Sequence, residues 1–237
     1  MLPVDLPAGT GLTDNQTMEA VEVALARVLT GLLRMSVSIT IDDRLRITAF
    51  PETGEPIVIS LEAVNRKLRR LFLHQIELEL QKRRTLIEAH RLKALRGTVA
   101  PGEIFRLAAD GTLFVSLEST DSCRRLILAG LCPVRCQPRH ERGRYTIGTV
   151  REFYITSVLP VMVNRRSCRV RILLSRTSKE LPRLLLQERS RVSGIHCRKR
   201  IPGGYSDLVT PVTISKDAIN SVGKEQGEHL HVSRRIS

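Results

Sequence analysis

The stretch LSRTSKELPRLLLQE, residues 174–188, joins a strand to a helix without a linker. An apolar strand-like run ends at Leu174, and leucines recur at helical spacing after the Ser-Arg-Thr corner. Thr177 or Ser178 is placed to cap the helix, and Pro182 falls in its first turns, where a missing N–H is tolerated. A corner of this kind predicts a fixed angle between the domain that ends here and the domain that begins here.

Upstream of the corner, residues 98–177 contain about five short apolar runs separated by turn residues, with Asp110-Gly111 as a hairpin turn. This spacing favours a small closed β-barrel over a sandwich. Alternation within GEIFRLAADGTLFVSL, residues 102–117, predicts four side chains that point into the barrel: Ile104, Leu113, Val115 and Leu117.

The same alternation turns Phe105 and Phe114 to the outside of the barrel. The chain has only five phenylalanines and no tryptophan, so two outward aromatic side chains on one hairpin are unusual. On a basic barrel they are suited to stack on the bases of single-stranded RNA. The alternative is that they pack against a neighbouring helix or domain.

The residues before the barrel predict an α/β head. Apolar spacing predicts a helix over 17–34 capped by Asp14 or Thr17, and then a β-hairpin turning at Asp42-Asp43. Ser60 can cap a further helical segment over 61–95, as one long helix or two in series, which Gly97 ends. The polar side of that segment is basic, which fits phosphate contacts or an ordinary solvated face: Arg66, Lys67, Arg69, Arg70, Lys82, Arg83, Arg84, Arg91 and Lys93.

The formal net charge is +14, and Arg and Lys far outnumber Asp and Glu between residues 122 and 200. Such a field attracts polyanions, and the planar fork of arginine suits phosphate. After the corner, the pattern predicts a helix at 179–190, a basic strand, a second strand in LVTPVTIS, a helix in KDAINSVGKE and a final strand in EHLHVSRR.

Other function classes have little support. We find no phosphate-binding glycine-rich loop, nucleophile elbow or carboxylate pair, so we expect a binding protein rather than an enzyme, without a cofactor. Cys132, Cys136 and His140 are spaced four apart, but a zinc site needs a fourth ligand, and incidental thiols are the better interpretation. No membrane-spanning run or signal peptide is evident, so we expect reduced cysteines in the cytoplasm.

The order of these pieces resembles the bacterial NusA family of transcription elongation and termination factors. ISLEAVNRK at 59–67 is similar to the entry into that family's long helix, and residues 102–117 to its first S1 hairpin. ILLSRTSKELPRLLLQE at 172–188 resembles the junction between its S1 barrel and first KH domain. RKRIPGGY at 198–205 and GKEQGEHLHV at 223–232 resemble parts of that KH domain.

The resemblance implies an α+β multidomain chain with four parts: a lead-in at 1–13, a polymerase-binding head at 14–96, an S1-type (OB-fold) barrel at 97–177 and a truncated KH-like domain at 178–237. The family's RNA-clamping GxxG loop has no counterpart, because PVTISKDAINSV at 211–222 contains no glycine. A second KH domain has no counterpart before Ser237. We therefore expect KH-type RNA recognition to be weak or lost.

The resulting expectation is a monomeric NusA-like factor in the transcription complex, with RNA polymerase and single-stranded or nascent RNA as partners. The alternative is a structural RNA-binding subunit of a ribosome-associated or RNA-processing complex. The residues expected to contact RNA are Phe105, Arg106, Phe114, Arg124, Arg125, Arg144, Arg151, Arg176, Arg198, Lys199 and Arg200.

Overall fold

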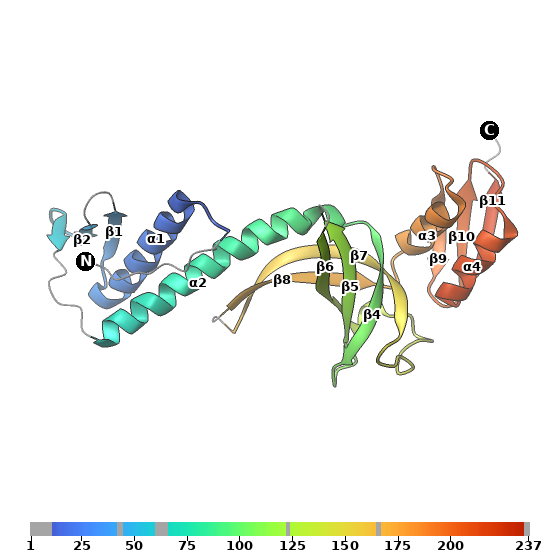
Figure 1. The fold of residues 1–237 in the computed structure, drawn as a ribbon, viewed down its shortest axis with the longest axis horizontal. Helices are drawn as coiled ribbons and strands as arrows, with labels where there is room; N and C mark the ends of the chain where they lie inside the picture. Colours follow the sequence, from blue (N-terminus) through green and yellow to red (C-terminus); the bar gives the residue numbers. More distant parts are fainter. Residues whose placement is uncertain (1–10, 42–44, 60–65, 122–123, 165–166, 235–237) are drawn as a thin grey trace. The chain divides into compact units, whose positions relative to one another are not determined.

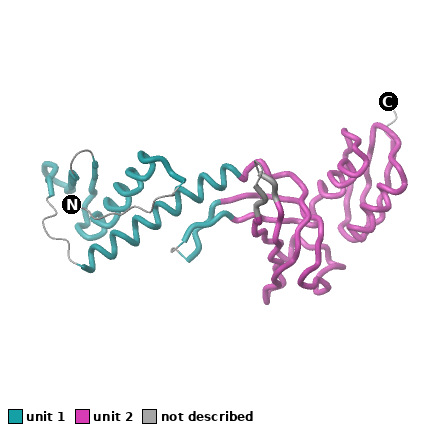
Figure 2. Tube along the Cα trace, in the orientation of Figure 1, with its two compact units in different colours: residues 1–91, 160–170 teal, residues 92–159, 171–237 magenta. Residues whose placement is uncertain are grey.

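The computed structural model describes residues 11–41, 45–59, 66–121, 124–164 and 167–234. The chain divides into two compact units, the first formed by residues 1–91 with 160–170 and the second by 92–159 with 171–237 (Figure 2). The fold is α+β, as the sequence predicts. The predicted barrel and the predicted C-terminal domain belong to the same unit, apart from the tip of one barrel hairpin.

The first unit begins with helix α1 (Asp14–Leu33), followed by strands β1 (Ser36–Ile41), β2 (Leu45–Phe50) and β3 (Ile57–Ile59). The strands form an antiparallel sheet in the order β1-β2-β3, which confirms the predicted hairpin, although its turn lies outside the described residues. The predicted caps of α1 are wrong. Thr13 caps it, because its hydroxyl accepts the N–H of Gln16 while the Gln16 side chain accepts the N–H of Thr13.

Helix α2 (Arg66–Arg91) is one continuous helix, and a 3-10 turn, η1 (Leu92–Leu95), follows it. The proposed cap at Ser60 lies outside the described residues. The apolar stripe of α1 packs on Phe72, Ile76 and Leu80 of α2 and on the sheet. The helical segment ends where predicted, because Gly97 takes a left-handed φ of +88° and turns the chain into the barrel.

The barrel is formed by β4 (Val99–Leu107), β5 (Leu113–Asp121), β6 (Arg124–Cys132), β7 (Val150–Val163) and β8 (Ser167–Ser175). It closes in the order β4-β5-β6-β8-β7, with β6 and β8 parallel (Figure 1). The four residues predicted to point inward are at most 1% exposed, so that prediction is confirmed. Strand β7 runs to Val163, well beyond its predicted GTVREFYI core.

Ser175 organises the strand-to-helix corner. Its hydroxyl accepts the N–H groups of Thr177 and Ser178, each at 3.1 Å. Helix α3 (Glu180–Ser190) begins two residues later than Ser178, whose hydroxyl accepts the N–H of Glu180 at 3.3 Å. The N-cap residue is Lys179, which makes no side-chain capping hydrogen bond, so the prediction of Thr177 or Ser178 as the cap is wrong. Ser178 contacts only the first N–H group of the helix, and the Thr177 hydroxyl pairs with that of Ser175. Pro182 lies in the first turn, as predicted.

The chain continues through β9 (His196–Ile201), β10 (Tyr205–Thr210), α4 (Lys216–Gln226) and β11 (His229–Arg234). The sheet order is β11-β10-β9, with β10 antiparallel to β9 and parallel to β11. Leucines of α3 pack with Val222 of α4 and with Leu208 and Leu230 of the sheet. Residues 211–228 are all described and hold a single helix, so this αββαβ domain has one helical connection between β10 and β11.

Candidate nucleic-acid interface

The outer face of the β4–β5 hairpin carries an aromatic and arginine cluster formed by Phe105, Arg106 and Phe114. The strand register shifts between Ile104 and Arg106, so Phe105 occupies an irregular position and both it and Arg106 are exposed. The two rings lie 6.3 Å apart between centroids at an angle of 60°. The Arg106 guanidinium carbon lies 3.6 Å from the Phe114 ring centroid.

This geometry gives the two phenylalanines different roles. Phe105 is 45% exposed and presents an open aromatic surface. Phe114 is half-buried, and one face of its ring is already covered by the Arg106 guanidinium. Alternation predicted the outward side correctly, but it could not predict the irregular register that brings Arg106 onto the ring.

Several other predicted residues are accessible. Arg144 is exposed in the loop formed by residues 137–149, and the Arg151 side chain at the start of β7 is 42% exposed. Arg198 and Lys199 are exposed on β9, with the Lys199 ammonium 5.8 Å from the ring centroid of Tyr205. Arg124 and Arg125 begin β6, but their side chains lie outside the described part of the structure.

The prediction that Arg176 contacts RNA is wrong, because its side chain is fully buried. It donates two hydrogen bonds of 2.7 Å to the two carboxylate oxygens of Glu141. It also donates to Oε1 and the backbone carbonyl of Glu225, each at 3.0 Å, and to the Glu152 carbonyl at 2.9 Å. The corner arginine therefore connects the barrel, the 137–149 loop and α4. We call these contacts the Arg176 network.

Arg200 must also be removed from the RNA-binding set, because its side chain is 1% exposed. It is paired with the buried carboxylate of Glu228, with Nη2 and Oε1 separated by 2.6 Å. It also donates to the carbonyl of Arg176 at 2.9 Å and to Gln226 Oε1 at 2.9 Å. Glu228 in turn accepts the hydroxyl of Ser206 at 2.7 Å. The second buried arginine thus ties the corner to the αββαβ domain.

The electrostatics of the Arg176 network follow from this pairing. Burial raises the pKa of Glu141, but the hydrogen bonds and charge of Arg176 outweigh burial and keep the pKa below its usual value. The Tyr145 hydroxyl also donates to Glu141, and burial together with this hydrogen bond raises the pKa of Tyr145. Burial and the nearby Glu225 charge raise the pKa of Glu152. Glu141 stays charged because Arg176 donates to both of its carboxylate oxygens.

His140 lies in a notch made by two glycines of the αββαβ domain. A Cβ atom at Gly203 would lie 1.9 Å from His140 Nδ1, and one at Gly227 would lie 2.8 Å from Nε2. Both glycines have positive φ, of 81° and 60°. Glycine is therefore the residue that fits at both positions beside the His140 ring. The 137–149 loop and the αββαβ domain pack closely against each other there.

The cysteine and histidine spacing has no sign of a metal site. Burial raises the pKa of the Cys132 thiol to about 12, and its Sγ donates to the Cys136 carbonyl at 3.6 Å. Among the described residues, no group of three or more His, Cys, Asp or Glu side chains could hold a metal ion. His140 belongs to the glycine notch instead.

The basic residues of α2 separate into two groups. Arg66, Lys67, Arg69 and Arg70 are exposed in its first turns. Farther along, Lys82 pairs with Glu79 and Arg83 pairs with Glu19 of α1, each at 2.7 Å. Lys82 and Arg83 are therefore held in ion pairs, whereas the first turns offer a basic surface, and Arg91 and Lys93 are also exposed at the other end of the segment.

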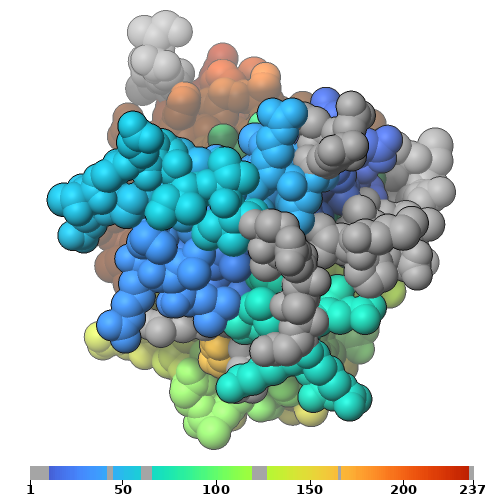
Figure 3. Space-filling view, turned by 90° about the vertical axis from the view of Figure 1, so that its left-hand side faces the viewer, coloured from blue at the N-terminus to red at the C-terminus, as the bar shows by residue number. Residues whose placement is uncertain are grey.

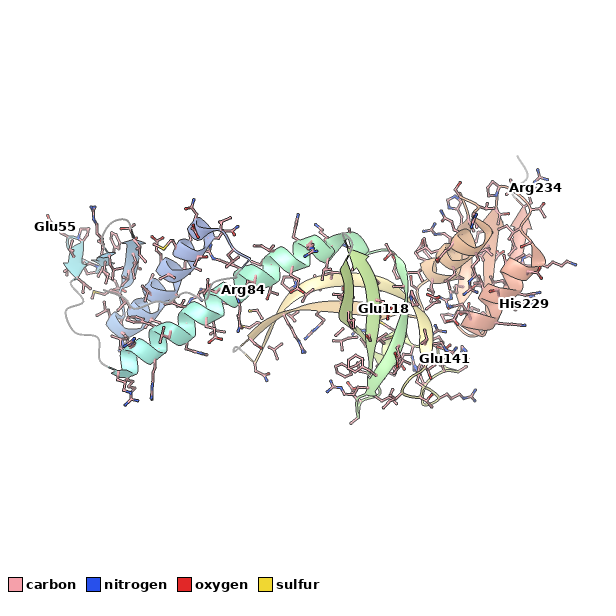
Figure 4. All side chains as sticks on the ribbon, viewed as in Figure 1. Glu55, Arg84, Glu118, Glu141, His229 and Arg234 are labelled. Atoms are coloured by element: carbon pink, nitrogen blue, oxygen red, sulfur yellow. The ribbon has the colours of Figure 1, made fainter. Side chains whose placement is uncertain are left out.

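Sequence reasoning missed the glutamates that organise the second unit. Glu141, Glu225 and Glu228 come from distant segments, and Figure 4 labels Glu141 among them. The sequence carried a signal only for Glu141, which lies between Arg139 and Arg142. Glu225 and Glu228 meet their arginines only through the tertiary fold.

No protein-family model and no curated protein sequence significantly matches this chain. None of the described helices is both long and apolar enough to cross a membrane.

Proposed function

We propose that this protein is a NusA-like transcription elongation and termination factor that binds RNA polymerase and contacts nascent RNA. One observation carries the proposal: a long helix leads directly into a closed five-stranded barrel, and a Ser-Arg-Thr corner joins that barrel to an αββαβ domain. In this proposal the barrel corresponds to the S1 domain of the family. The αββαβ domain corresponds to a KH-like domain that lacks the RNA-clamping loop.

The barrel is the principal RNA-binding element. Small five-stranded OB-type barrels bind oligonucleotides on their second and third strands and adjacent loops. Here the second strand carries Phe114, beside the exposed Phe105 and Arg106 of the first strand. A base stacks on Phe105, while exposed arginines neutralise neighbouring phosphates without reading sequence.

The αββαβ domain contributes charge rather than a KH clamp. KH domains grip four nucleotides with a GxxG loop, and residues 211–228 have neither that loop nor a second helix. Arg198 and Lys199 on β9 still present positive charge to the RNA. The Arg176 network holds the barrel and the αββαβ domain in one unit. The RNA contacts of the two domains therefore add to the same binding free energy.

The first unit is the polymerase-docking element. Its edge strand β3 exposes Ile57 by 52% and Val58 by 76%. Figure 3 shows this segment at the surface, in cyan. An edge strand with exposed apolar side chains supports docking onto another protein, and the basic first turns of α2 add charge to the same unit.

Co-purification of the full chain with bacterial core RNA polymerase tests the docking claim. We expect a complex that survives gel filtration at moderate salt. RNA binding without any polymerase binding would reject the transcription-factor role and leave the alternative, a structural RNA-binding subunit.

Fluorescence anisotropy with a labelled single-stranded RNA tests the barrel. Phe105→Ala should weaken binding by about 1–3 kcal/mol, the value of one base stacked on an aromatic ring. Phe50→Ala is a matched control, because Phe50 is 44% exposed on β2 of the other unit. Equal affinity of both variants and the wild type would reject the stacking surface.

A further inference from the structure

A small pocket lies between the barrel and the αββαβ domain, within the second unit. Three segments line it: the 137–149 loop, the start of β7 and the last turn of α4. Its volume of about 220 Å³ is below the range of sites that enclose whole small-molecule ligands, so it suits a single ionic group.

The carboxylates that line this pocket are already satisfied. Both oxygens of Glu141 accept hydrogen bonds from Arg176, and Tyr145 donates to one of them. Glu225 Oε1 accepts the N–H of Glu152 and Arg176 Nη1, each at 3.0 Å. The Glu141 carboxylate and Oε1 of Glu225 are therefore directed toward the buried Arg176, and only Oε2 of Glu225 is left toward Arg151, at 3.9 Å.

The cations at the pocket are not satisfied. Within the described residues, Arg144 and Lys224 form no ion pair, and Arg151 has only a 3.9 Å approach to Glu225 Oε2. Three cations and two carboxylates line the pocket, and both carboxylates also pair with the buried Arg176 behind it, so the pocket has an excess of positive charge. Two arginine guanidinium groups and one lysine ammonium line the same small pocket. They supply the charged hydrogen-bond donors that bind phosphate.

The pocket is also pre-formed. His140 forms part of its wall and is fixed in the notch between Gly203 and Gly227. The Arg176 network holds the loop and α4 that carry the cations. An anion can therefore bind without an ordering cost for the surrounding backbone.

We propose that this pocket is a phosphate site in which Arg144, Arg151 and Lys224 bind one phosphodiester group of the RNA as it passes from the barrel to the αββαβ domain. The RNA source rests on the proposed function above. The site positions the strand by its backbone and carries no base preference, and it substitutes for the backbone grip that the missing GxxG loop would supply.

The test compares two variants with the same loss of charge. Arg144→Gln/Lys224→Gln removes two pocket cations. Lys216→Gln/Arg234→Gln removes two exposed cations that lie outside the pocket. Lys216 begins α4, at the end opposite Lys224, and Arg234 ends β11, at the end opposite His229 (Figure 4). Circular dichroism melts check that both remain folded. Single-stranded RNA affinity is then measured over a range of salt concentrations.

We expect the pocket variant to lose roughly tenfold in affinity, as for a charge-assisted contact, and its salt slope to fall by about 0.7 for the lost phosphate. The control variant should lose clearly less at each salt concentration. Equal losses in the two variants would overturn the pocket and leave RNA binding by the barrel intact.

A titration with inorganic phosphate, followed by ³¹P NMR, separates the two proposals. If the wild type binds phosphate and the pocket variant does not, while neither binds RNA, the anion site stands, and both the proposed function and the RNA source are rejected. Absence of both phosphate and RNA binding would overturn the site together with the proposed function.

Discussion

Replacing Arg176 by methionine should strongly destabilise the second unit. The change removes five hydrogen bonds and leaves the Glu141 and Glu225 side chains, 13% and 16% exposed, without their cation. Removing one partner of a buried ion pair costs about 3–5 kcal/mol. Tyr145 and the Glu152 N–H still donate to the two carboxylates, so we expect about 3 kcal/mol, near the lower end.

Urea unfolding followed by far-UV circular dichroism measures this loss, since the chain has no tryptophan to report by fluorescence. Arg83→Met is the matched control, because it breaks a 2.7 Å ion pair with Glu19 at the surface. The Arg83 side chain is 25% exposed and the Glu19 side chain 64% exposed. Such a surface pair contributes at most about 1 kcal/mol. The triple variant Arg176→Met/Glu141→Gln/Glu225→Gln should recover part of the stability, because it removes the uncompensated charges.

A loss of stability in Arg176→Met no larger than that in Arg83→Met would contradict a structural role for the buried arginine. It would mean that water replaces the guanidinium and that the Arg176 network does not couple the barrel to the αββαβ domain. Failure of the triple variant to recover any stability would show that packing, rather than buried charge, sets the cost.

Three further predictions concern the same unit. The lowered pKa of Glu141 contributes stability that is present above pH 4.5 and is lost as the pH falls through the folded-state pKa. Glu141→Gln should therefore flatten the fall of the unfolding free energy at acid pH, and a fall as steep as that of the wild type would contradict this expectation. Gly203→Ala should destabilise the fold, and a double-mutant cycle with His140→Ala should recover about 1 kcal/mol of that cost; complete additivity would disprove the notch. Cys132, with a pKa of about 12, has only about one thiolate in ten thousand molecules at pH 8, so peptide mapping after iodoacetamide treatment should find it modified far more slowly than the other described cysteines.

Sequence patterns predicted the regular elements well because those elements depend on local periodicity. The barrel interior at Ile104 and Val115 follows directly from alternation on paired strands. The α3 helix follows from leucine spacing and the tolerated Pro182. Errors occurred where a single residue decided a boundary, as at Thr13, whose capping role requires the reciprocal hydrogen bonds with Gln16.

The candidate site was less predictable, because the role of an arginine depends on partners far away in the sequence. Arg176 and Arg144 have the same chemistry, yet one is enclosed by glutamates from two distant segments and the other is exposed. Composition therefore predicts how much positive charge the chain carries, and only tertiary contacts separate structural arginines from those that are free to bind phosphate. The irregular register at Phe105 is a similar case, since it arises from strand pairing.

Photo-cross-linking of nascent RNA to the full chain, in a stalled elongation complex with bacterial RNA polymerase, tests directly whether this protein contacts RNA during transcription. We expect cross-links that map to the hairpin at Phe105 and to the 137–149 loop beside Arg144. Absence of cross-links, or cross-links confined to the first unit, would contradict the proposed RNA contact.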